Sequence, residues 1–341
     1  MKKVLIIGGT GTISTPITNR LVKDKEVELY VLNRGTKNIQ LASDVHYLKA
    51  DIFQKKEIEE LMKDNSFDSI INFIVWNKEN AKACIDLFKD KTKQFIYIST
   101  VCVLNHEITC NINEECIRGN MYSDYGQEKA EAEETFLRAY QEFGFPITIV
   151  RPTQTYSNDR IPLSVKGKGS YSVVSRMLQG KKVIIHGDGQ SVWASTHALD
   201  FAKGFCSLVG NNKSIGQIYQ IMNNTPHTWD MLYRKLADLL NVEYKPVYIS
   251  TELLQHSRQY QFSQSIKGDK HWSNIFDTSK IKRINPEFNC SIQIEDGLKM
   301  YLDYIEQHPQ VKIEEPEFDL WCEETIALYE KTSKLFISQI K

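Results

Sequence analysis

The chain has 341 residues, of which 41% are hydrophobic and 25% charged, a composition that excludes a disordered or collagen-like chain. Its 42 basic and 43 acidic residues nearly cancel, which argues against a general electrostatic affinity for nucleic acid or for membranes. Seven cysteines without C-x-x-C spacing, and no apolar run near the roughly 18 to 20 residues of a membrane helix, lead us to expect a cytoplasmic protein with reduced thiols.

Short β-branched runs alternate with amphipathic stretches over the first part of the chain. The runs are bounded by turn residues and predict strands at residues 4–7, 28–32, 69–75, 94–99 and 146–150. Between them, Ile13, Ile17 and Leu21 have helical spacing, and residues 122–143 predict a long helix. This alternation predicts right-handed crossovers and a doubly wound parallel sheet, an α/β fold of the Rossmann type.

The second half of the chain has a less regular pattern and predicts a smaller mixed α/β domain. Residues 158–170 predict a loop, and Thr228 is placed to cap the helix that follows it. Helical periodicity predicts helices at residues 229–241, 294–306 and 318–334. We therefore expect one domain over residues 1–155 and a second over 156–341, with some segments returning to the first and a helical extension at the end.

The sharpest local motif runs from Gly8 to Ser14, directly after the first predicted strand and at the start of the first predicted helix. Glycines allow the backbone to turn tightly and to approach a pyrophosphate, whose charge is stabilised by a helix N-terminus. Ser14 takes the third small position, where glycine is usual. We predict a dinucleotide site in the first domain, with contacts from Gly8, Thr10, Gly11, Thr12 and Ile13.

The second predicted strand ends with Asn33 and Arg34. Folds that bind NAD usually place an acidic residue here, which accepts hydrogen bonds from the adenosine ribose. Asn33 carries no charge, and Arg34 is placed to pair with a 2′-phosphate. We therefore expect NADP as the favoured cofactor and leave NAD open, since an ordinary exposed arginine is the other interpretation of Arg34.

Tyr125 and Lys129 lie on one face of the long predicted helix, because they are four residues apart. The helix follows the strand that ends near Ser99 and Thr100, whose carboxyl end faces the expected cofactor crevice. A tyrosine with its ordinary pKa near 10 needs a neighbouring cation to act as an acid or base around neutral pH. We favour this catalytic interpretation over a surface pair of no chemical consequence.

Together these motifs resemble the extended short-chain dehydrogenase/reductases, in particular the NAD-dependent epimerase/dehydratase family, which acts largely on nucleotide sugars. The resemblance covers nearly the whole chain and extends to residues 51–52, 151–152, 187–189, 197–200 and 276–280. It implies that the Thr100 hydroxyl binds the reacting oxygen, that Tyr125 moves its proton, and that Lys129 holds the nicotinamide ribose and lowers the tyrosine pKa. It also implies cofactor contacts at Asn33, Arg34, Asp51, Ile52, Phe73, Ser99, Tyr125, Lys129 and Pro152.

The resemblance implies hydride transfer at a hydroxyl or ketone of a sugar-like substrate, which we expect to be a nucleotide sugar, and a homodimer formed through the Tyr/Lys helix. The family's 4,6-dehydratases carry Asp-Glu after the catalytic Ser/Thr, whereas Val101 and Cys102 follow here, which weakens that activity. Many members have an arginine for the diphosphate where this chain has Trp193. Cys102, Trp193 and Lys270 are our candidates for substrate contacts.

Three other interpretations of the sequence compete with the enzymatic one. Cys102, His106, Cys110 and Cys116 lack the spacing of a zinc site, so we expect no metal. RNA-binding relatives of the chloroplast stem-loop type share several of the same motifs, but the near-zero net charge and the Thr/Tyr/Lys set argue against RNA. A cofactor-binding regulator without catalysis has no chemical need for that set.

Overall fold

The computed structural model describes residues 1–35, 44–107 and 111–341, which form two compact units. The first unit contains Met1–Thr155, Thr196–Asn224 and Phe276–Ser291. The second contains Tyr156–Ser195, Thr225–Ile275 and Ile292–Lys341. The chain passes between the two units five times, and three of these crossings lie in short strands, β8 (Gln154–Tyr156), β11 (Ser195–His197) and β15 (Ile275–Phe276).

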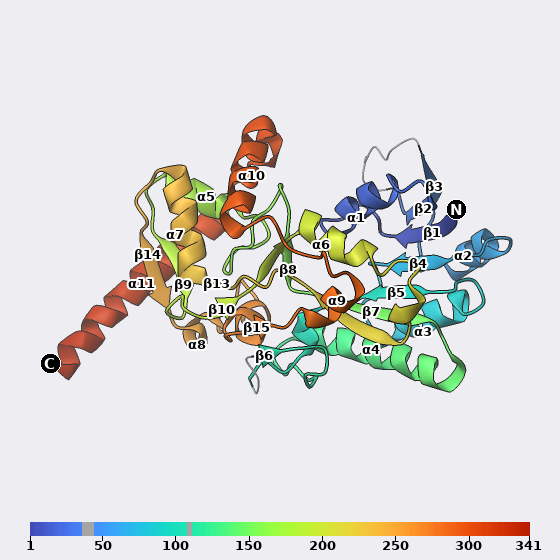
Figure 1. Ribbon diagram of the computed structural model, residues 1–341. Helices are drawn as coiled ribbons and strands as arrows, with labels where there is room; N and C mark the ends of the chain where they lie inside the picture. Colours follow the sequence, from blue (N-terminus) through green and yellow to red (C-terminus); the bar gives the residue numbers. More distant parts are fainter. Residues whose placement is uncertain (36–43, 108–110) are drawn as a thin grey trace. The chain divides into compact units, whose positions relative to one another are not determined.

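A seven-stranded sheet forms the centre of the first unit, in the order β3-β2-β1-β4-β5-β7-β12 (Figure 1). Every neighbouring pair is parallel. The strands are β1 (Lys2–Ile7), β2 (Val27–Asn33), β3 (Val45–Lys49), β4 (Ser69–Asn72), β5 (Phe95–Ile98), β7 (Ile147–Pro152) and β12 (Gln217–Ile221). The predicted α/β class and doubly wound sheet are confirmed. The strand order reverses between β1 and β4, the point at which such sheets usually bind ligands.

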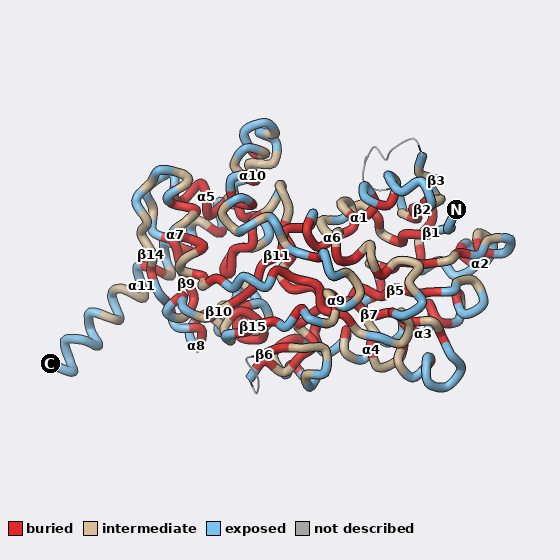
Figure 2. Tube along the Cα trace, viewed as in Figure 1, coloured by how far each residue is buried: buried red, intermediate tan, exposed pale blue. Residues whose placement is uncertain are grey.

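Helices cover both faces of this sheet. They are α1 (Ser14–Leu21) and α6 (Ala198–Cys206) on one face, and α2 (Lys55–Met62), α3 (Lys78–Phe88) and α4 (Asp124–Phe143) on the other. Side chains alternate between the two cores along β1: Val4 and Ile6 pack with α1 and α6, whereas Leu5 and Ile7 pack with α2, α3 and α4. The central strands are consequently buried on both sides, whereas the edge strand β3 is largely exposed (Figure 2).

Two predicted elements of the first unit have different bounds in the structure. The strand expected at 69–75 ends at Asn72, because its side-chain oxygen accepts hydrogen bonds from the backbone N–H groups of Ile74 (2.7 Å) and Val75 (3.0 Å). The helix expected from residue 122 begins at Asp124, after Ser123 accepts from the Gly126 N–H. The pattern analysis did not foresee β3 and α3.

The second unit combines helices with short strands around its own core. Its elements are α5 (Tyr171–Leu178), β9 (Val183–His186), β10 (Val192–Trp193), β13 (His227–Thr228), α7 (Trp229–Leu240), β14 (Pro246–Ile249), α8 (Thr251–Leu254), the π-helix Ser263–Lys270, α10 (Ile294–Gln307) and α11 (Pro316–Ile340). Thr228 caps α7 as predicted, accepting from the Met231 N–H. Within the described ranges, no helix has the length and apolar character needed to cross a membrane.

Candidate active site

The glycine turn between β1 and α1 is closed by a serine. Ser14 donates its hydroxyl hydrogen to the Gly8 carbonyl (2.7 Å) and accepts from the Gly11 N–H (2.7 Å). Thr18, one turn further along α1, donates to the Gly9 carbonyl (2.9 Å). At the position where glycine is usual, the Ser14 side chain therefore stabilises the turn through two hydrogen bonds. Gly8 has φ +85°, a conformation that favours glycine.

A cavity of about 290 Å³ opens beside this turn, at the carboxyl ends of β1, β2 and β3. Seven of the predicted cofactor residues line it: Gly8, Thr10, Gly11, Asn33, Arg34, Asp51 and Ile52. The rest of its described lining was not foreseen: Ile7, Leu32, Gly35, Tyr47, Ala50, Phe53 and Ile74. Its size is near the lower limit for ligand pockets and suits the adenosine end of a dinucleotide.

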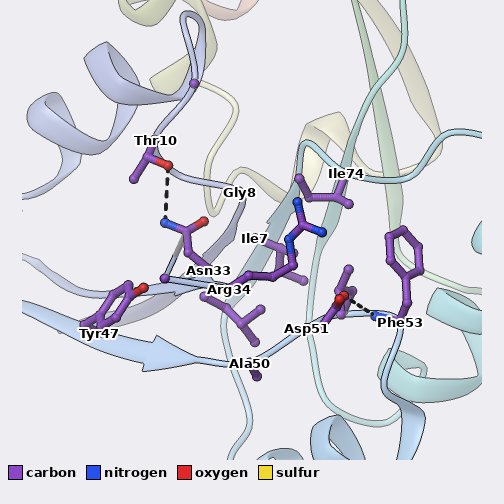
Figure 3. A pocket seen from close by; sticks show the side chains of 14 residues that line it. Ile7, Gly8, Thr10, Asn33, Arg34, Tyr47, Ala50, Asp51, Phe53 and Ile74 are labelled. Atoms are coloured by element: carbon purple, nitrogen blue, oxygen red, sulfur yellow. Dashed lines mark hydrogen bonds between the residues drawn. The ribbon is translucent and has the colours of Figure 1, made fainter. Parts of the chain in front are cut away.

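The polar groups of this cavity come from three neighbouring chain segments (Figure 3). Asn33 at the end of β2 donates weakly to the Thr10 hydroxyl at 3.5 Å. Arg34 is exposed at the cavity, and Asp51 accepts from the Phe53 N–H at 3.1 Å. Among the described residues, the cavity thus offers the Arg34 cation and the Asp51 carboxylate to the ribose, a 2′-phosphate or the adenine.

The glycine turn has room for a dinucleotide at Gly11. A Cβ added there would meet only the Ser14 hydroxyl, at 3.4 Å, so the protein itself leaves space above this residue. A Cβ on Gly9, in contrast, would lie 3.0 Å from Val31 and 3.2 Å from the Thr18 hydroxyl. Gly9 therefore serves helix–strand packing, whereas Gly11 leaves a surface that a pyrophosphate can approach.

Three consecutive residues after β4 connect this cavity with the predicted catalytic helix. Ile74 lines the cavity and packs so closely on Gly8 that a Cβ there would lie 2.7 Å from it. Val75 offers its carbonyl to the Lys129 ammonium. The Trp76 ring lies 4.7 Å from the Tyr125 ring, and half of its surface is exposed. The segment thus joins the two halves of the site.

Lys129 is buried in α4, one helical turn after Tyr125. Its Nζ donates to the carbonyl oxygens of Val75 and Ile98, both at 2.8 Å. Burial lowers its pKa to about 7. The ammonium lies 5.9 Å from the centroid of the Tyr125 ring and 4.8 Å from that of Tyr97. A cation with adjustable protonation is therefore held beside the predicted acid–base residue.

Thr100 lies at the start of a 3₁₀ turn, Val101–Val103, that packs against α4. Its hydroxyl oxygen accepts from the Cys102 N–H at 3.2 Å, so its hydrogen can be donated to another group. A Cβ on Gly126 would lie 2.2 Å from the Cys102 carbonyl oxygen. Only glycine allows this approach, which brings the turn of α4 that bears Tyr125 against the segment that follows Thr100. The sequence analysis did not single out Gly126, although it directly follows Tyr125.

A buried ion pair ties α4 to β7 one turn beyond Lys129. Arg151 donates to both carboxylate oxygens of Glu133, at 2.8 and 2.6 Å, and to the Glu114 carbonyl at 3.1 Å. Both charged side chains are almost completely buried. A bidentate pair of this kind holds a helix at a defined rotation, and Glu133 also raises the pKa of Lys129 against the effect of burial.

The other predicted cofactor residues lie outside the described lining of the cavity. Thr12 and Ile13 are half-buried between the glycine turn and α1. Phe73 packs on Phe205 of α6. Ser99 and Pro152 are buried, and lie next to β5 and at the end of β7.

The three substrate candidates belong to different units. Cys102, in the first unit, is half-buried and accepts from Asn120 through its carbonyl. Trp193 is completely buried in the second unit, and its ring lies 6.4 Å from the Trp229 ring. Lys270, also in the second unit, donates to the Ser265 carbonyl and pairs with Asp269 at 3.0 Å.

Within the described residues, no group of three or more His, Cys, Asp or Glu side chains is arranged to hold a metal ion. Cys110, one of the four residues weighed for zinc, lies outside them. Cys116 is engaged locally with the Asn113 amide N–H at 3.3 Å.

A family model for the NAD dependent epimerase/dehydratase family matches residues 4–222. The chain belongs to this family. The resemblance inferred from the motifs is thereby confirmed, and with it the class of NAD-dependent epimerases and dehydratases. The match includes the glycine turn, the Thr100 segment and the Tyr/Lys helix.

Characterised relatives of this family member are distant in sequence. It is 22% identical over 343 residues to a trifunctional UDP-glucose 4,6-dehydratase/UDP-4-keto-6-deoxy-D-glucose 3,5-epimerase/UDP-4-keto-L-rhamnose-reductase of Arabidopsis thaliana, covering 91% of this chain and 48% of that protein. It is 24% identical over 267 residues to human dTDP-D-glucose 4,6-dehydratase, covering 70% of this chain and 74% of the relative. The chain thus spans about half the length of the plant relative.

Solved structures show the same fold. The UDP-glucuronic acid 4-epimerase of Bacillus cereus, in complex with UDP-glucuronic acid and NAD, superimposes with a TM-score of 0.71 at 19% identity. The superposition covers 89% of this chain and 99% of the epimerase.

Proposed function

We propose that this family member is an NAD(P)-dependent enzyme that transfers hydride at a hydroxyl or ketone carbon of a nucleotide sugar. The observation that carries the proposal is the segment 74–76, which links the dinucleotide cavity to Lys129 and to the Tyr125 ring. The named relatives act on UDP- and dTDP-sugars, which supports the substrate class.

Each predicted catalytic residue has a task that its surroundings support. Nicotinamide, when bound, supplies the hydride chemistry. In the oxidation direction, the ionised phenol of Tyr125 takes the proton of the substrate hydroxyl, and Thr100 donates a hydrogen bond to the same oxygen. Lys129, in its charged form, stabilises the phenolate. Reduction runs through the same groups in reverse.

The residues after Thr100 bear on the type of reaction. Elimination of water from a sugar needs an acid and a base in addition to the tyrosine, and Val101 and Cys102 supply neither at neutral pH unless the thiol ionises. We therefore propose epimerisation or reduction in preference to 4,6-dehydration. Epimerisation returns the hydride to the opposite face of the same carbon, and reduction releases oxidised cofactor.

The preference for NADP over NAD is the finer part of this proposal. What supports it is Arg34 at the cavity and the uncharged Asn33 at the end of β2, where an acidic residue favours NAD. The Asp51 carboxylate lines the same cavity and would repel the negative charge of a 2′-phosphate. We expect NADPH to bind more tightly than NADH, and Arg34→Ala to lose about one to two decades of NADPH affinity. Equal affinities in the wild type, measured by calorimetry, would contradict it.

The function is tested by incubating the full chain with UDP- and dTDP-sugars and NAD or NADP. Nicotinamide absorbance detects net reduction, and chromatography of the sugars detects epimerisation, which leaves the absorbance unchanged. Tyr125→Phe removes one hydroxyl and is expected to lower turnover by about two to four decades with unchanged cofactor affinity. Wild-type turnover in this variant would refute the assignment. Steeply salt-dependent RNA binding without turnover would favour the RNA-binding alternative.

A further inference from the structure

The last helix of the second unit, α11, extends beyond the elements it packs on (Figure 1). Its first part is anchored in the core by Phe318, Cys322 and Ile326, which are buried. Its last part is exposed (Figure 2), and it carries several large apolar side chains among polar ones. The exposed apolar side chains are Leu328, Leu335, Phe336, Ile337 and Ile340, each at least 48% accessible.

A groove of about 320 Å³ runs along the same helix, between α11 and the α8 segment. Leu253 and Leu254 line it on one side, and Trp321, Leu328 and Tyr329 on the other. Its lining is mainly apolar. The unit therefore presents both an apolar groove and an apolar helix end, which are joined along one helix.

The groove side of α11 has the spacing of a coiled-coil seam. Residues 321, 325, 328, 332 and 335 are separated alternately by four and three positions. Large side chains occupy one seam position (Trp321, Leu328 and Leu335), and threonines occupy the other. In an antiparallel pair of identical helices these two positions pack against each other, so each large side chain meets a threonine. In a parallel pair Trp321 would face its own copy.

The charges beside the seam favour the same orientation. Asp319, Glu323 and Glu330 form ion pairs with Arg176, Lys181 and Lys182 of their own unit. Glu324 and Lys331 are exposed, and the described part of the chain provides neither with an ion-pair partner. They lie seven residues apart on one edge of the seam. In an antiparallel pair this edge faces the same edge of the other helix, so Glu324 of each copy meets Lys331 of the other.

We propose that a second copy of this chain occupies the groove, through antiparallel, two-fold pairing of the α11 helices. Two-fold pairing is self-complementary: each copy contributes one groove and one helix end. This surface differs from the Tyr/Lys helix expected from the family resemblance to mediate dimerisation, and the proposal does not depend on the enzymatic activity.

The test is the mass of the full chain by sedimentation velocity between about 1 and 50 μM. The wild-type mass should rise with concentration to that of a dimer, or to that of a dimer of dimers if the Tyr/Lys helix also pairs. Leu328→Ser combined with Phe336→Ser should raise the dissociation constant of this concentration-dependent step at least tenfold. Leu320→Ser is the matched control, because Leu320 is 58% exposed on α11 but does not line the groove. It should leave the dimer intact.

Charge reversal tests the orientation. Glu324→Lys and Lys331→Glu should each weaken the dimer, because each places like charges together at two symmetric points. The double variant Glu324→Lys/Lys331→Glu should restore wild-type association. A wild-type mass that does not rise with concentration, an association step that the Leu328/Phe336 change leaves unaltered, or a double variant no better than the single ones would each overturn the proposal. Circular dichroism confirms that the variants are folded.

Discussion

Lys129 combines a buried charge with two backbone acceptors, and this makes its protonation sensitive to pH. Its amine can leave its hydrogen bonds to Val75 and Ile98 only at the cost of two unsatisfied carbonyl groups. Burial nevertheless lowers its pKa to about 7, so the charged and neutral forms are both accessible near neutral pH. The residue thus holds the site together and also determines the charge beside Tyr125.

The first prediction concerns this titration. The pKa of Lys129 is about 7 in the folded chain and about 10.4 in the unfolded one, so between these values the unfolded state binds more protons. The free energy of unfolding of the wild type should therefore rise with pH across this window, relative to Lys129→Met, by about 2 kcal/mol from pH 7 to 9. Urea unfolding without cofactor measures it. If the difference in the free energy of unfolding between the wild type and Lys129→Met did not change with pH, the pKa of Lys129 would not be lowered in the folded chain. In the active enzyme, Lys129→Met should also weaken cofactor binding and move the activity profile to higher pH.

A second residue prediction follows from the open space at Gly11. Gly11→Val places two methyl groups where a pyrophosphate would approach, while the protein itself offers only the Ser14 hydroxyl nearby. We expect an unchanged circular dichroism spectrum and lost dinucleotide affinity. Gly9→Val is the contrasting variant, because its side chain would collide with Val31 and destabilise the fold. Retained affinity in Gly11→Val would mean that the turn does not hold the phosphates.

At the scale of elements, α4 is the part of the molecule on which the site depends most. Gly126 allows it to touch the Cys102 carbonyl, Arg151 grips it through Glu133, and Phe136 anchors it in the core beneath the sheet. These contacts are distributed along the first four turns of one helix. They restrain both its distance from the Thr100 segment and its rotation, which is what an acid–base residue needs in order to reach one oxygen atom.

Gly126→Ala tests this dependence. The added Cβ would lie 2.2 Å from a backbone oxygen, so the helix or the 3₁₀ turn must move. Overpacking of this kind costs about 1 to 3 kcal/mol. We expect kcat to fall at least tenfold while dinucleotide affinity, measured by calorimetry, changes little. Glu128→Ala, an exposed position on the same helix, should leave kcat unchanged. Wild-type kcat in Gly126→Ala would show that the contact does not position Tyr125.

At the scale of the whole molecule, two buried histidines are expected to make the second unit sensitive to acid. His186 and His227 are buried in the second unit, and burial lowers the pKa of each to about 4. Both rings lie near Trp229, at 5.6 and 5.5 Å. Since these histidines bind protons readily only when the unit unfolds, acid favours its unfolded state.

The expected outcome is a loss of stability as the pH falls from 6.5 to 4. Each histidine contributes about 3 kcal/mol to this loss of the free energy of unfolding, because its pKa rises from about 4 to about 6.5 on unfolding. Tryptophan fluorescence during urea unfolding follows it, since four of the five tryptophans belong to the second unit. His227→Gln should flatten the slope. His46→Gln, at an exposed histidine of the first unit, should not, and equal slopes in both variants would contradict the prediction.

Much of the fold could be read from local patterns. The strand before Gly8 and the capping threonine at 228 each determine structure within a few residues, because turn geometry and helix caps are local interactions. The cap at Ser123 is equally local, but it was not predicted. The positions of Tyr125 and Lys129 on one helical face follow from the helical repeat alone. The cavity residues that follow β1 and lie at the end of β2 (Gly8, Asn33 and Arg34) were predicted because parallel strands bring their carboxyl ends to one edge of the sheet, whereas Ile7 and Leu32 beside them were not.

What the sequence by itself determined, then, was the family, the parallel sheet and the residues of the glycine turn and the Tyr/Lys helix. The tertiary structure decided the contacts between distant segments: that Val75 and Ile98 accept from Lys129, that Cys102 lies against Gly126, and that Trp193 is core and not surface. It also decided that three separate stretches share the first unit. These contacts depend on packing across many residues of chain, and periodicity carries information only about neighbours along a helix or strand.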